Sequence, residues 1–192
     1  LSLSVKHNVK KFIFVSSVKA GGVSRQGKCA TEKSLSEPDG VYGKTKREAE
    51  LKVLEAGRKS DMHVSILRPA LIYGPKVKGN LQLMMQGIKK GWFPPLPEIG
   101  NRRSMIHVDD IVRALLFLSN NKKSNGEVFI ATDGRVYSSR NIYEIMCHVL
   151  DKNIPNWSVP RLLFNAIARL SSGFKYKIDK LLGDECYSSK KL

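Results

Sequence analysis

The sequence predicts an α/β fold organised around a parallel sheet. Two short apolar runs, Lys11–Ser17 and His63–Arg68, are rich in β-branched and aromatic residues, and strong helix formers occupy residues 41–58 between them. A strand, a helix and a second strand in this order form a βαβ unit, in which the two strands are parallel. The length of 192 residues and the 42% of hydrophobic residues allow a core of ordinary size.

Further along the chain, the residue patterns predict four more helices and one more strand. The helices are expected at 81–90, 109–118, 138–150 and 160–170, and the strand at 127–131. Ser138 or Ser139 is suited to cap the helix at 138–150, and Asp109 or Asp110 the helix at 109–118. Short polar side chains at these positions accept hydrogen bonds from the first free amide groups of a helix.

The formal net charge of +16 is unusual for a chain of this length. Such a charge suits nucleic acid, an anionic membrane surface or phosphorylated substrates. The basic residues do not form one long run and aromatic residues are not interleaved with them, so no nucleic-acid partner is expected. A non-catalytic basic binding module is the alternative from a different functional class.

The hydropathy of the chain indicates no membrane partner. No run of about 18 apolar residues is present, so the sequence predicts no transmembrane helix. The stretch 160–170 is apolar and basic, with Leu162, Leu163 and Phe164 in succession. We interpret it as the buried apolar face of a small domain in preference to a helix that lies on a membrane surface.

The three cysteines, Cys29, Cys147 and Cys186, are far apart in the sequence. An odd number of scattered cysteines does not predict a disulfide framework or a structural zinc site, and no metal is expected. The natural compartment for such a chain is the reducing cytoplasm.

Tyr42 and Lys46 stand four residues apart near the start of the helix predicted at 41–58, so they lie on one face of it. An ammonium group one turn away stabilises a phenolate, and the pair can therefore exchange a proton with a substrate hydroxyl. Ser16 and Ser17 end the preceding strand at its carboxyl edge, where ligands bind in open α/β sheets. Ser17 can hydrogen-bond the same hydroxyl.

Four blocks of sequence occur in a recognisable order. They are Phe12-Ile-Phe-Val-Ser-Ser17, Tyr42-Gly-Lys-Thr-Lys46, Leu67-Arg-Pro-Ala-Leu-Ile-Tyr-Gly-Pro75 and Asn101-Arg-Arg-Ser-Met-Ile-His-Val-Asp-Asp110. Together they resemble the NAD-dependent epimerase/dehydratase family of extended short-chain dehydrogenase/reductases, in which UDP-glucose 4-epimerase is typical. The resemblance implies that residues 1–75 are the C-terminal half of a Rossmann-like domain. Residues 76–192 are then mainly a smaller, helix-rich substrate-binding domain, although the strand at 127–131 returns to the sheet.

The resemblance also implies roles for individual residues. Tyr42 is the expected catalytic base, Lys46 holds the nicotinamide ribose, and Ser17 orients the sugar hydroxyl. The residues expected to bind the cofactor, NAD in preference to NADP, are Ser16, Tyr42, Lys46, Pro69, Ala70 and Leu71. The residues expected to bind a nucleotide sugar are Ser17, Asn80, Leu96, Pro97 and Arg103, with Leu96 and Pro97 at the nucleobase and Arg103 at the diphosphate.

The activity implied is 4-epimerisation of a nucleotide sugar through a 4-keto intermediate, by a cytoplasmic homodimer. Ser17 is followed by Val18 and Lys19 where the family's 4,6-dehydratases carry an Asp-Glu pair, so dehydration is not expected. Leu71 stands where many 4-epimerases carry an asparagine, and a 4-ketosugar reductase is therefore the close alternative.

The glycine-rich turn with which this family binds the cofactor pyrophosphate has no match in the chain. We expect an N-terminal region carrying that turn to belong to the gene product. This chain alone is expected to bind NAD(P) poorly and to be inactive.

Overall fold

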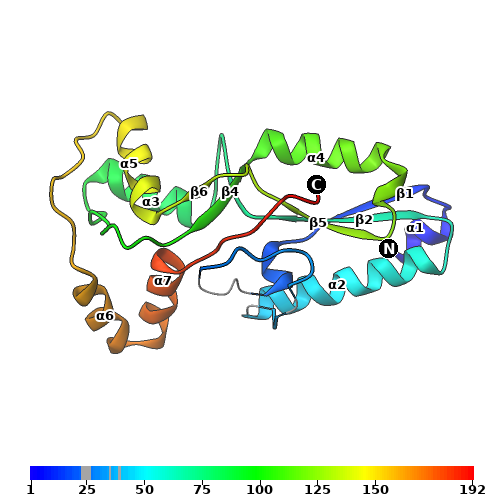
Figure 1. The fold of residues 1–192 in the computed structure, drawn as a ribbon, viewed down its shortest axis with the longest axis horizontal. Coiled ribbons are helices and arrows are strands. Elements are labelled where there is room, and N and C mark those ends of the chain that lie inside the picture. The colour runs from blue at the N-terminus through cyan, green and yellow to red at the C-terminus, as the bar shows by residue number, and fades with distance from the viewer. Residues whose placement is uncertain (23–26, 35, 39) are drawn as a thin grey trace. The chain divides into compact units, whose positions relative to one another are not determined.

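A computed structural model describes residues 1–22, 27–34, 36–38 and 40–192 of the chain. Its strands and helices divide into two compact units, which are described separately (Figure 1). The sheet unit comprises residues 1–74, 104–135 and 186–192, and the helical unit comprises residues 75–103 and 136–185.

The sheet unit is built on three parallel strands in the order β1–β2–β5. These strands are β1 (Lys11–Val15), β2 (His63–Pro69) and β5 (Glu127–Ala131). In their register Phe14 pairs with Ile66, and Leu67 pairs with Phe129. The predicted α/β class with a parallel sheet is confirmed, and each predicted strand forms within two residues of its expected bounds.

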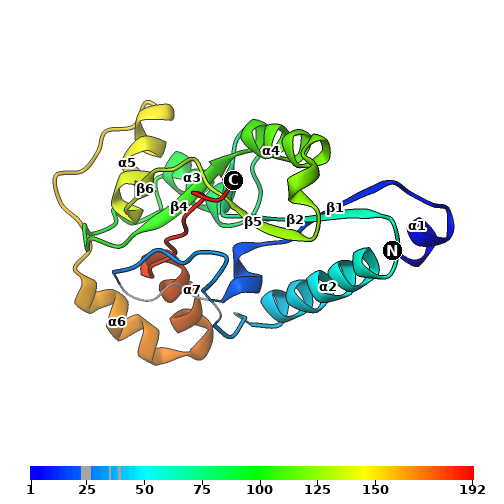
Figure 2. The ribbon, with the colours of Figure 1, turned by 45° about the vertical axis from the view of Figure 1, so that its right-hand side comes forward.

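Two helices cover opposite faces of this sheet, α2 (Gly40–Arg58) and α4 (Val108–Asn120) (Figures 1 and 2). Successive side chains of a strand point to opposite faces, so each strand contributes to both layers. On the α2 face the buried cluster contains Val53, Met62, Val64 and Ile66, with Phe12 and Phe14 packed against it. On the α4 face the buried cluster contains Leu67, Ile106, Ile111, Ala114, Leu118, Phe129 and Ala131.

The other elements of the sheet unit are short. They are α1 (Ser2–Lys6), the 3-10 helices η1 (Val18–Gly21) and η2 (Lys122–Ser124), and the strand β3 (Leu71–Tyr73), which pairs in parallel with β4 (Arg103–His107). None of these was predicted. Segments of three or four residues are too short to display a helix or strand period, and the five-residue segments α1 and β4 lack the apolar run that marks β1 and β5.

The helical unit contains α3 (Asn80–Lys90), β6 (Val136–Tyr137), α5 (Ser139–Val149), α6 (Arg161–Leu170) and α7 (Ser172–Leu182). The helices predicted at 81–90, 138–150 and 160–170 are confirmed, and α7 was not predicted. Ser138 caps α5 as expected, in a reciprocal capping box with Asn141. Gly91 ends α3 with a φ of 77°, a left-handed conformation that favours glycine.

The cap of α4 differs from the prediction. The helix begins at Val108, and the ring of His107, not Asp109 or Asp110, caps it by accepting a hydrogen bond from the Asp109 amide, with 3.2 Å between Nδ1 and N. The helix begins one residue earlier than predicted, so both aspartates lie inside its first turn. His107 is thus a structural hydrogen-bonding residue.

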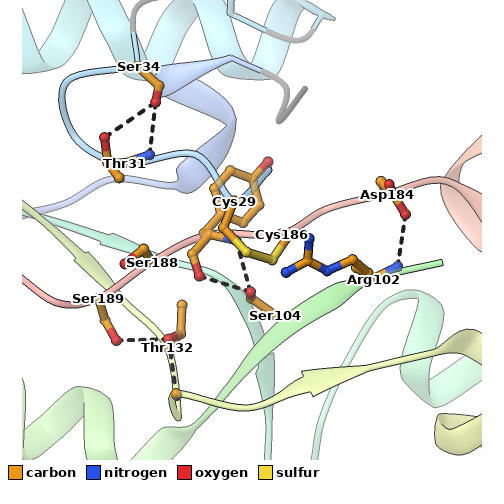
Figure 3. Close-up of a disulfide and its surroundings, with 12 residues drawn as sticks. Cys29, Thr31, Ser34, Arg102, Ser104, Thr132, Asp184, Cys186, Ser188 and Ser189 are labelled. Atoms are coloured by element: carbon orange, nitrogen blue, oxygen red, sulfur yellow. Dashed lines mark hydrogen bonds between the residues drawn. A yellow bond between two sulfur atoms is a disulfide. The ribbon is translucent and has the colours of Figure 1, made fainter. Parts of the chain in front are cut away.

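The inference from scattered cysteines against disulfides is wrong for Cys29 and Cys186, which form a disulfide in the sheet unit (Figure 3). The two residues are 157 positions apart, so their spacing carries no signal. Ala30 brings them together, because its amide donates to the Cys186 carbonyl at 2.8 Å and its carbonyl accepts from the Ser188 amide at 2.9 Å. Cys147 is a free, buried thiol.

The apolar helix α6 is also less buried than expected. Phe164 is its one buried residue, and Leu162 and Leu163 are exposed. The interpretation of residues 160–170 as a buried apolar face is therefore wrong for all but a small part of the helix.

Candidate functional site

Ser16 and Ser17 follow β1 and point in different directions. The alternation that turns Phe14 toward α2 also turns Ser16 there, and its buried hydroxyl donates to Glu50 Oε1 at 2.6 Å. Ser17 is half-buried, and its hydroxyl oxygen accepts a hydrogen bond from the Lys19 amide at 3.3 Å, capping η1. This contact does not use the hydroxyl proton of Ser17. Ser17 is therefore better suited than Ser16 to contact a ligand.

Tyr42 and Lys46 lie in the first two turns of α2, and Lys46 reaches back to the end of β1. Its ammonium donates to the Val15 carbonyl at 3.0 Å. The same nitrogen lies 5.0 Å from the centroid of the Phe14 ring and 5.9 Å from that of the Tyr42 ring. Tyr42 is 57% exposed. The structure thus brings Lys46 to the residue directly before Ser16 and Ser17, with Tyr42 one turn away.

A glycine allows the start of α2 to approach η1 closely. A Cβ atom at Gly43 would come within 2.6 Å of the Lys19 carbonyl oxygen, a distance that no side chain tolerates. Gly43 is buried, whereas the neighbouring Tyr42 is exposed. This packing fixes the helix that carries Tyr42 against the loop that follows Ser17.

Glu50 and Arg68 form a buried ion pair beneath this site. Arg68 Nε donates to Glu50 Oε1 at 2.8 Å, and Nη2 donates to Oε2 at 2.6 Å. The two side chains are 2% and 1% exposed. Because Glu50 also accepts from Ser16, the pair joins α2, β1 and β2. The sequence analysis did not predict this pair, although an arginine at the end of the apolar run 63–68 was a signal.

Pro69, Ala70 and Leu71 lie at the carboxyl end of β2, the strand next to β1. Pro69 is in register with Ala131, and the Ala70 amide donates to the Ala131 carbonyl at 3.0 Å. Leu71 is half-buried and starts β3. These residues and Ser17 therefore share the carboxyl edge of the sheet, where parallel α/β sheets bind ligands.

Three of the predicted substrate-binding residues have different environments within the helical unit. Asn80 is the first residue of α3 and is exposed. Leu96 is 0% exposed and Pro97 is buried, so their side chains face the interior of the unit in this structure. The Leu96 carbonyl accepts a hydrogen bond from Arg140 at 3.1 Å.

Arg103 is largely buried and holds the end of α7. Its guanidinium donates to the carbonyls of Lys180 and Leu181, and it pairs with Glu185 at 3.3 Å. These partners are compatible with a structural role for Arg103. A planar guanidinium has five N–H donors and can hold further acceptors. The contact of Arg103 with a diphosphate therefore stays a prediction.

Within the described part of the chain, no group of three or more His, Cys, Asp or Glu side chains is arranged to hold a metal ion. The site described here consists of hydroxyl, phenol and ammonium groups at a sheet edge. Such groups exchange protons and donate hydrogen bonds, which is the chemistry of an acid–base site.

The comparisons with known proteins show the family of the chain. The sequence model of the NAD dependent epimerase/dehydratase family matches residues 1–131. A UDP-glucose 4-epimerase of Vibrio cholerae is 32% identical over 160 residues, 82% of this chain and 48% of that protein. The N-acetyl-alpha-D-glucosaminyl-diphospho-ditrans,octacis-undecaprenol 4-epimerase of Escherichia coli O157:H7 is 26% identical over 190 residues, 94% of this chain and 56% of that protein. The chain belongs to the NAD-dependent epimerase/dehydratase family, as its sequence blocks predicted.

A solved structure supports the fold. The UDP-glucose 4-epimerase of Thermotoga maritima, determined with UDP-glucose, matches with a TM-score of 0.71 and 24% identity, over 83% of this chain and 53% of that chain. The Rossmann-like character predicted for the sheet is therefore confirmed. The chain spans about half the length of the relatives that it matches.

Proposed function

We propose that the protein containing this chain is an NAD(P)-dependent nucleotide-sugar 4-epimerase, and that this chain supplies its acid–base residues. The observation that carries the proposal is the hydrogen bond from Lys46 to the Val15 carbonyl at 3.0 Å. It holds the ammonium at Val15, the residue directly before the two serines that follow β1, while Tyr42 is exposed one turn earlier on the same helix.

The residues at the sheet edge suit a nicotinamide cofactor of either kind, and NAD is favoured. The Lys46 ammonium has three protons, of which one is used by Val15, so two are available to ribose hydroxyls. When bound, the cofactor accepts a hydride from the sugar carbon and returns it. Leu71 and the buried Ala70 offer an apolar surface next to the carboxyl end of β2.

The protein's own part in the reaction is proton transfer. Tyr42, as phenolate, takes the proton of the sugar 4-hydroxyl, and the nearby Lys46 ammonium stabilises the phenolate charge. Ser17 donates its hydroxyl proton in a hydrogen bond to the same sugar oxygen and so orients it. In the return step Tyr42 gives the proton back to the oxygen of the 4-keto sugar, which regains its hydroxyl in the opposite configuration.

A 4-ketosugar reductase is the second candidate, and Leu71 is the residue that favours it. A leucine at the start of β3 cannot donate the hydrogen bond that an asparagine amide would offer to a substrate. The two activities differ in stoichiometry, since a reductase consumes one NAD(P)H per sugar and an epimerase consumes none. Absorbance at the nicotinamide band during turnover separates them.

The substrate is proposed to be a sugar joined to a diphosphate. In a nucleotide sugar, Asn80 and Arg103 would contact the sugar and the diphosphate, and Leu96 and Pro97 would lie at the nucleobase. The relative from Escherichia coli O157:H7 is named for a sugar diphosphate carried on a polyprenol. The substrate panel should therefore contain UDP sugars and one polyprenol-linked sugar.

The experiment that tests the proposal is the change Tyr42→Phe in the full-length protein. Loss of the acid–base group is expected to lower kcat by about 100- to 10,000-fold with sugar-nucleotide binding retained. Tyr176→Phe is the matched control, because Tyr176 is 56% exposed on another helix and should leave kcat unchanged. Unchanged turnover in the Tyr42 variant would remove Tyr42 as the base. A gel shift with nucleic acid and no sugar turnover would support a basic binding module.

A further inference from the structure

Helix α6 presents an apolar stripe to its surroundings. Leu162 and Leu170 are 79% and 77% exposed, and Leu163 and Ile167 are also exposed. At 100° per residue these four positions fall within an arc of roughly 140° on one side of the helix. Phe164 lies outside that arc and is the residue by which α6 is anchored. The stripe therefore does not belong to the core of the helical unit.

Helix α7 also carries exposed apolar side chains. It packs against α6, and Figure 2 shows the two helices side by side. Phe174 and Tyr176 of α7 are both exposed. We call the surface formed by Leu162, Leu163, Ile167, Leu170, Phe174 and Tyr176 the α6–α7 patch.

Basic residues accompany the α6–α7 patch. Residues 161–182 contain five basic side chains and one acidic side chain, a net charge of 5 − 1 = +4. The basic residues are Arg161, Arg169, Lys175, Lys177 and Lys180. The ammonium of Lys180 lies 4.2 Å from the centroid of the Tyr176 ring, so charge and apolar surface meet within the patch. An amphipathic helix pair of this composition matches a surface in which an anionic outer layer covers an apolar interior.

Two other occupants fit the charge less well. A second copy of the chain would bring another net charge of +16 against a basic surface, which opposes association. A nucleic acid would meet mainly the aliphatic residues of α6, with Phe174 and Tyr176 as the two aromatic rings of the patch, whereas single strands bind to a succession of stacking rings. Among the described residues no helix is long and apolar enough to cross a membrane. A surface position, with α6 parallel to the bilayer, is compatible with its length of 10 residues.

In place of the expectation from sequence that the protein has no membrane partner, we propose that the α6–α7 patch docks the protein on an anionic lipid bilayer. The leucines and Ile167 insert into the boundary between headgroups and acyl chains, and the basic side chains contact lipid phosphates. The proposal is independent of the reaction that the protein catalyses, because it involves none of the residues at the sheet edge.

The test is cosedimentation of the full-length protein with vesicles of phosphatidylglycerol and phosphatidylcholine, compared with vesicles of phosphatidylcholine alone. We expect binding to the anionic vesicles at low salt, and weaker binding at high salt. The double variant Leu162→Ser/Leu170→Ser should bind at least about tenfold more weakly, because each leucine loses a buried aliphatic side chain. Both residues are exposed in the protein, so the thermal midpoint should not change.

The matched control is Leu116→Ser/Val149→Ser, which removes exposed apolar residues of α4 and α5. It should bind the anionic vesicles as the unchanged protein does. Equal binding by the two double variants would overturn the proposal, as would the absence of binding to anionic vesicles at low salt. A change of oligomeric state in the Leu162/Leu170 variant, without vesicle binding by the unchanged protein, would assign the patch to self-association and overturn it as well.

Discussion

Arg68 and Glu50 make two parallel hydrogen bonds inside the sheet unit, at 2.8 and 2.6 Å. Both side chains are almost completely buried, and the Ser16 hydroxyl shares the carboxylate. Buried charges of this kind are tolerated when their polar atoms are paired, as they are here. The arrangement links the residues that follow β1, and the strand β2, to the helix that carries Tyr42 and Lys46.

The change Glu50→Gln is expected to destabilise the protein strongly. It leaves the buried guanidinium of Arg68 without a counter-charge, and breaking a buried pair in this way costs about 3–5 kcal/mol. The free energy of unfolding, measured by urea denaturation of the full-length protein, checks this value.

Glu55→Gln provides the control, because Glu55 pairs with Lys59 on the exposed face of the same helix. It should leave the urea midpoint unchanged within error. The double variant Glu50→Leu/Arg68→Met should recover much of the stability lost by Glu50→Gln, because apolar side chains then replace both charges. A Glu50→Gln protein as stable as the unchanged one would mean that this charge pair is not buried.

The longer elements were predictable from the sequence because each carries a full structural period. The strands at Lys11–Val15 and His63–Pro69 are apolar runs of ordinary strand length, and α2 is a long stretch of helix formers. The order strand, helix, strand then determined the parallel pairing. The position of Tyr42 and Lys46 on one face of α2 followed from helix geometry alone.

Features that depend on distant parts of the chain were not predictable. The Cys29–Cys186 disulfide closes a separation of 157 residues, and nothing near either cysteine indicates its partner. The environment of Arg103 depends on the carbonyls of Lys180 and Leu181 at the end of α7. The mixed polar and apolar sequence of α7 did not predict a helix there. Such contacts are set by tertiary packing, which overrides local pattern.

The disulfide is expected to hold the segment after Ser17 to the C-terminal residues 186–188. In the oxidised protein, Cys29 and Cys186 should not react with a thiol reagent even after denaturation, and Cys147 should react only after denaturation, because Cys147 is 1% exposed. The change Cys186→Ser should lower the free energy of unfolding by about 2–5 kcal/mol, as for other native disulfides. Thiol titration and urea denaturation measure the two effects.

The double variant Cys29→Ser/Cys186→Ser is the control for this prediction. Dithiothreitol should lower the urea midpoint of the unchanged protein and have no effect on the double variant. Reaction of Cys29 and Cys186 with the thiol reagent in aerobically purified, denatured protein, located by peptide mapping, would show that the two cysteines are not joined in solution.

His63 is expected to make stability depend on pH. Its Nε2 lies 3.1 Å from Ser65 Oγ and 3.0 Å from Ser124 Oγ in a half-buried position. Burial, and then the positive charge of Lys11 on the neighbouring strand, lower the pKa of His63 from its ordinary value of 6.5. The folded protein therefore binds a proton at His63 less readily than the unfolded chain does.

Between the pKa of His63 in the folded protein and its ordinary value of 6.5, the unfolded chain binds more protons than the folded protein. The contribution of His63 to stability is therefore complete above about pH 6.5, and it is lost as the pH falls toward the lowered pKa of the folded protein. His63→Gln should remove this contribution and give a shallower fall in the free energy of unfolding between about pH 7 and pH 5. His7→Gln is the control, because the exposed ring of His7 loses little water on folding. If the pH dependence of the His63 variant runs parallel to that of the unchanged protein, His63 does not control stability in this range, and its burial is too slight to favour the neutral ring.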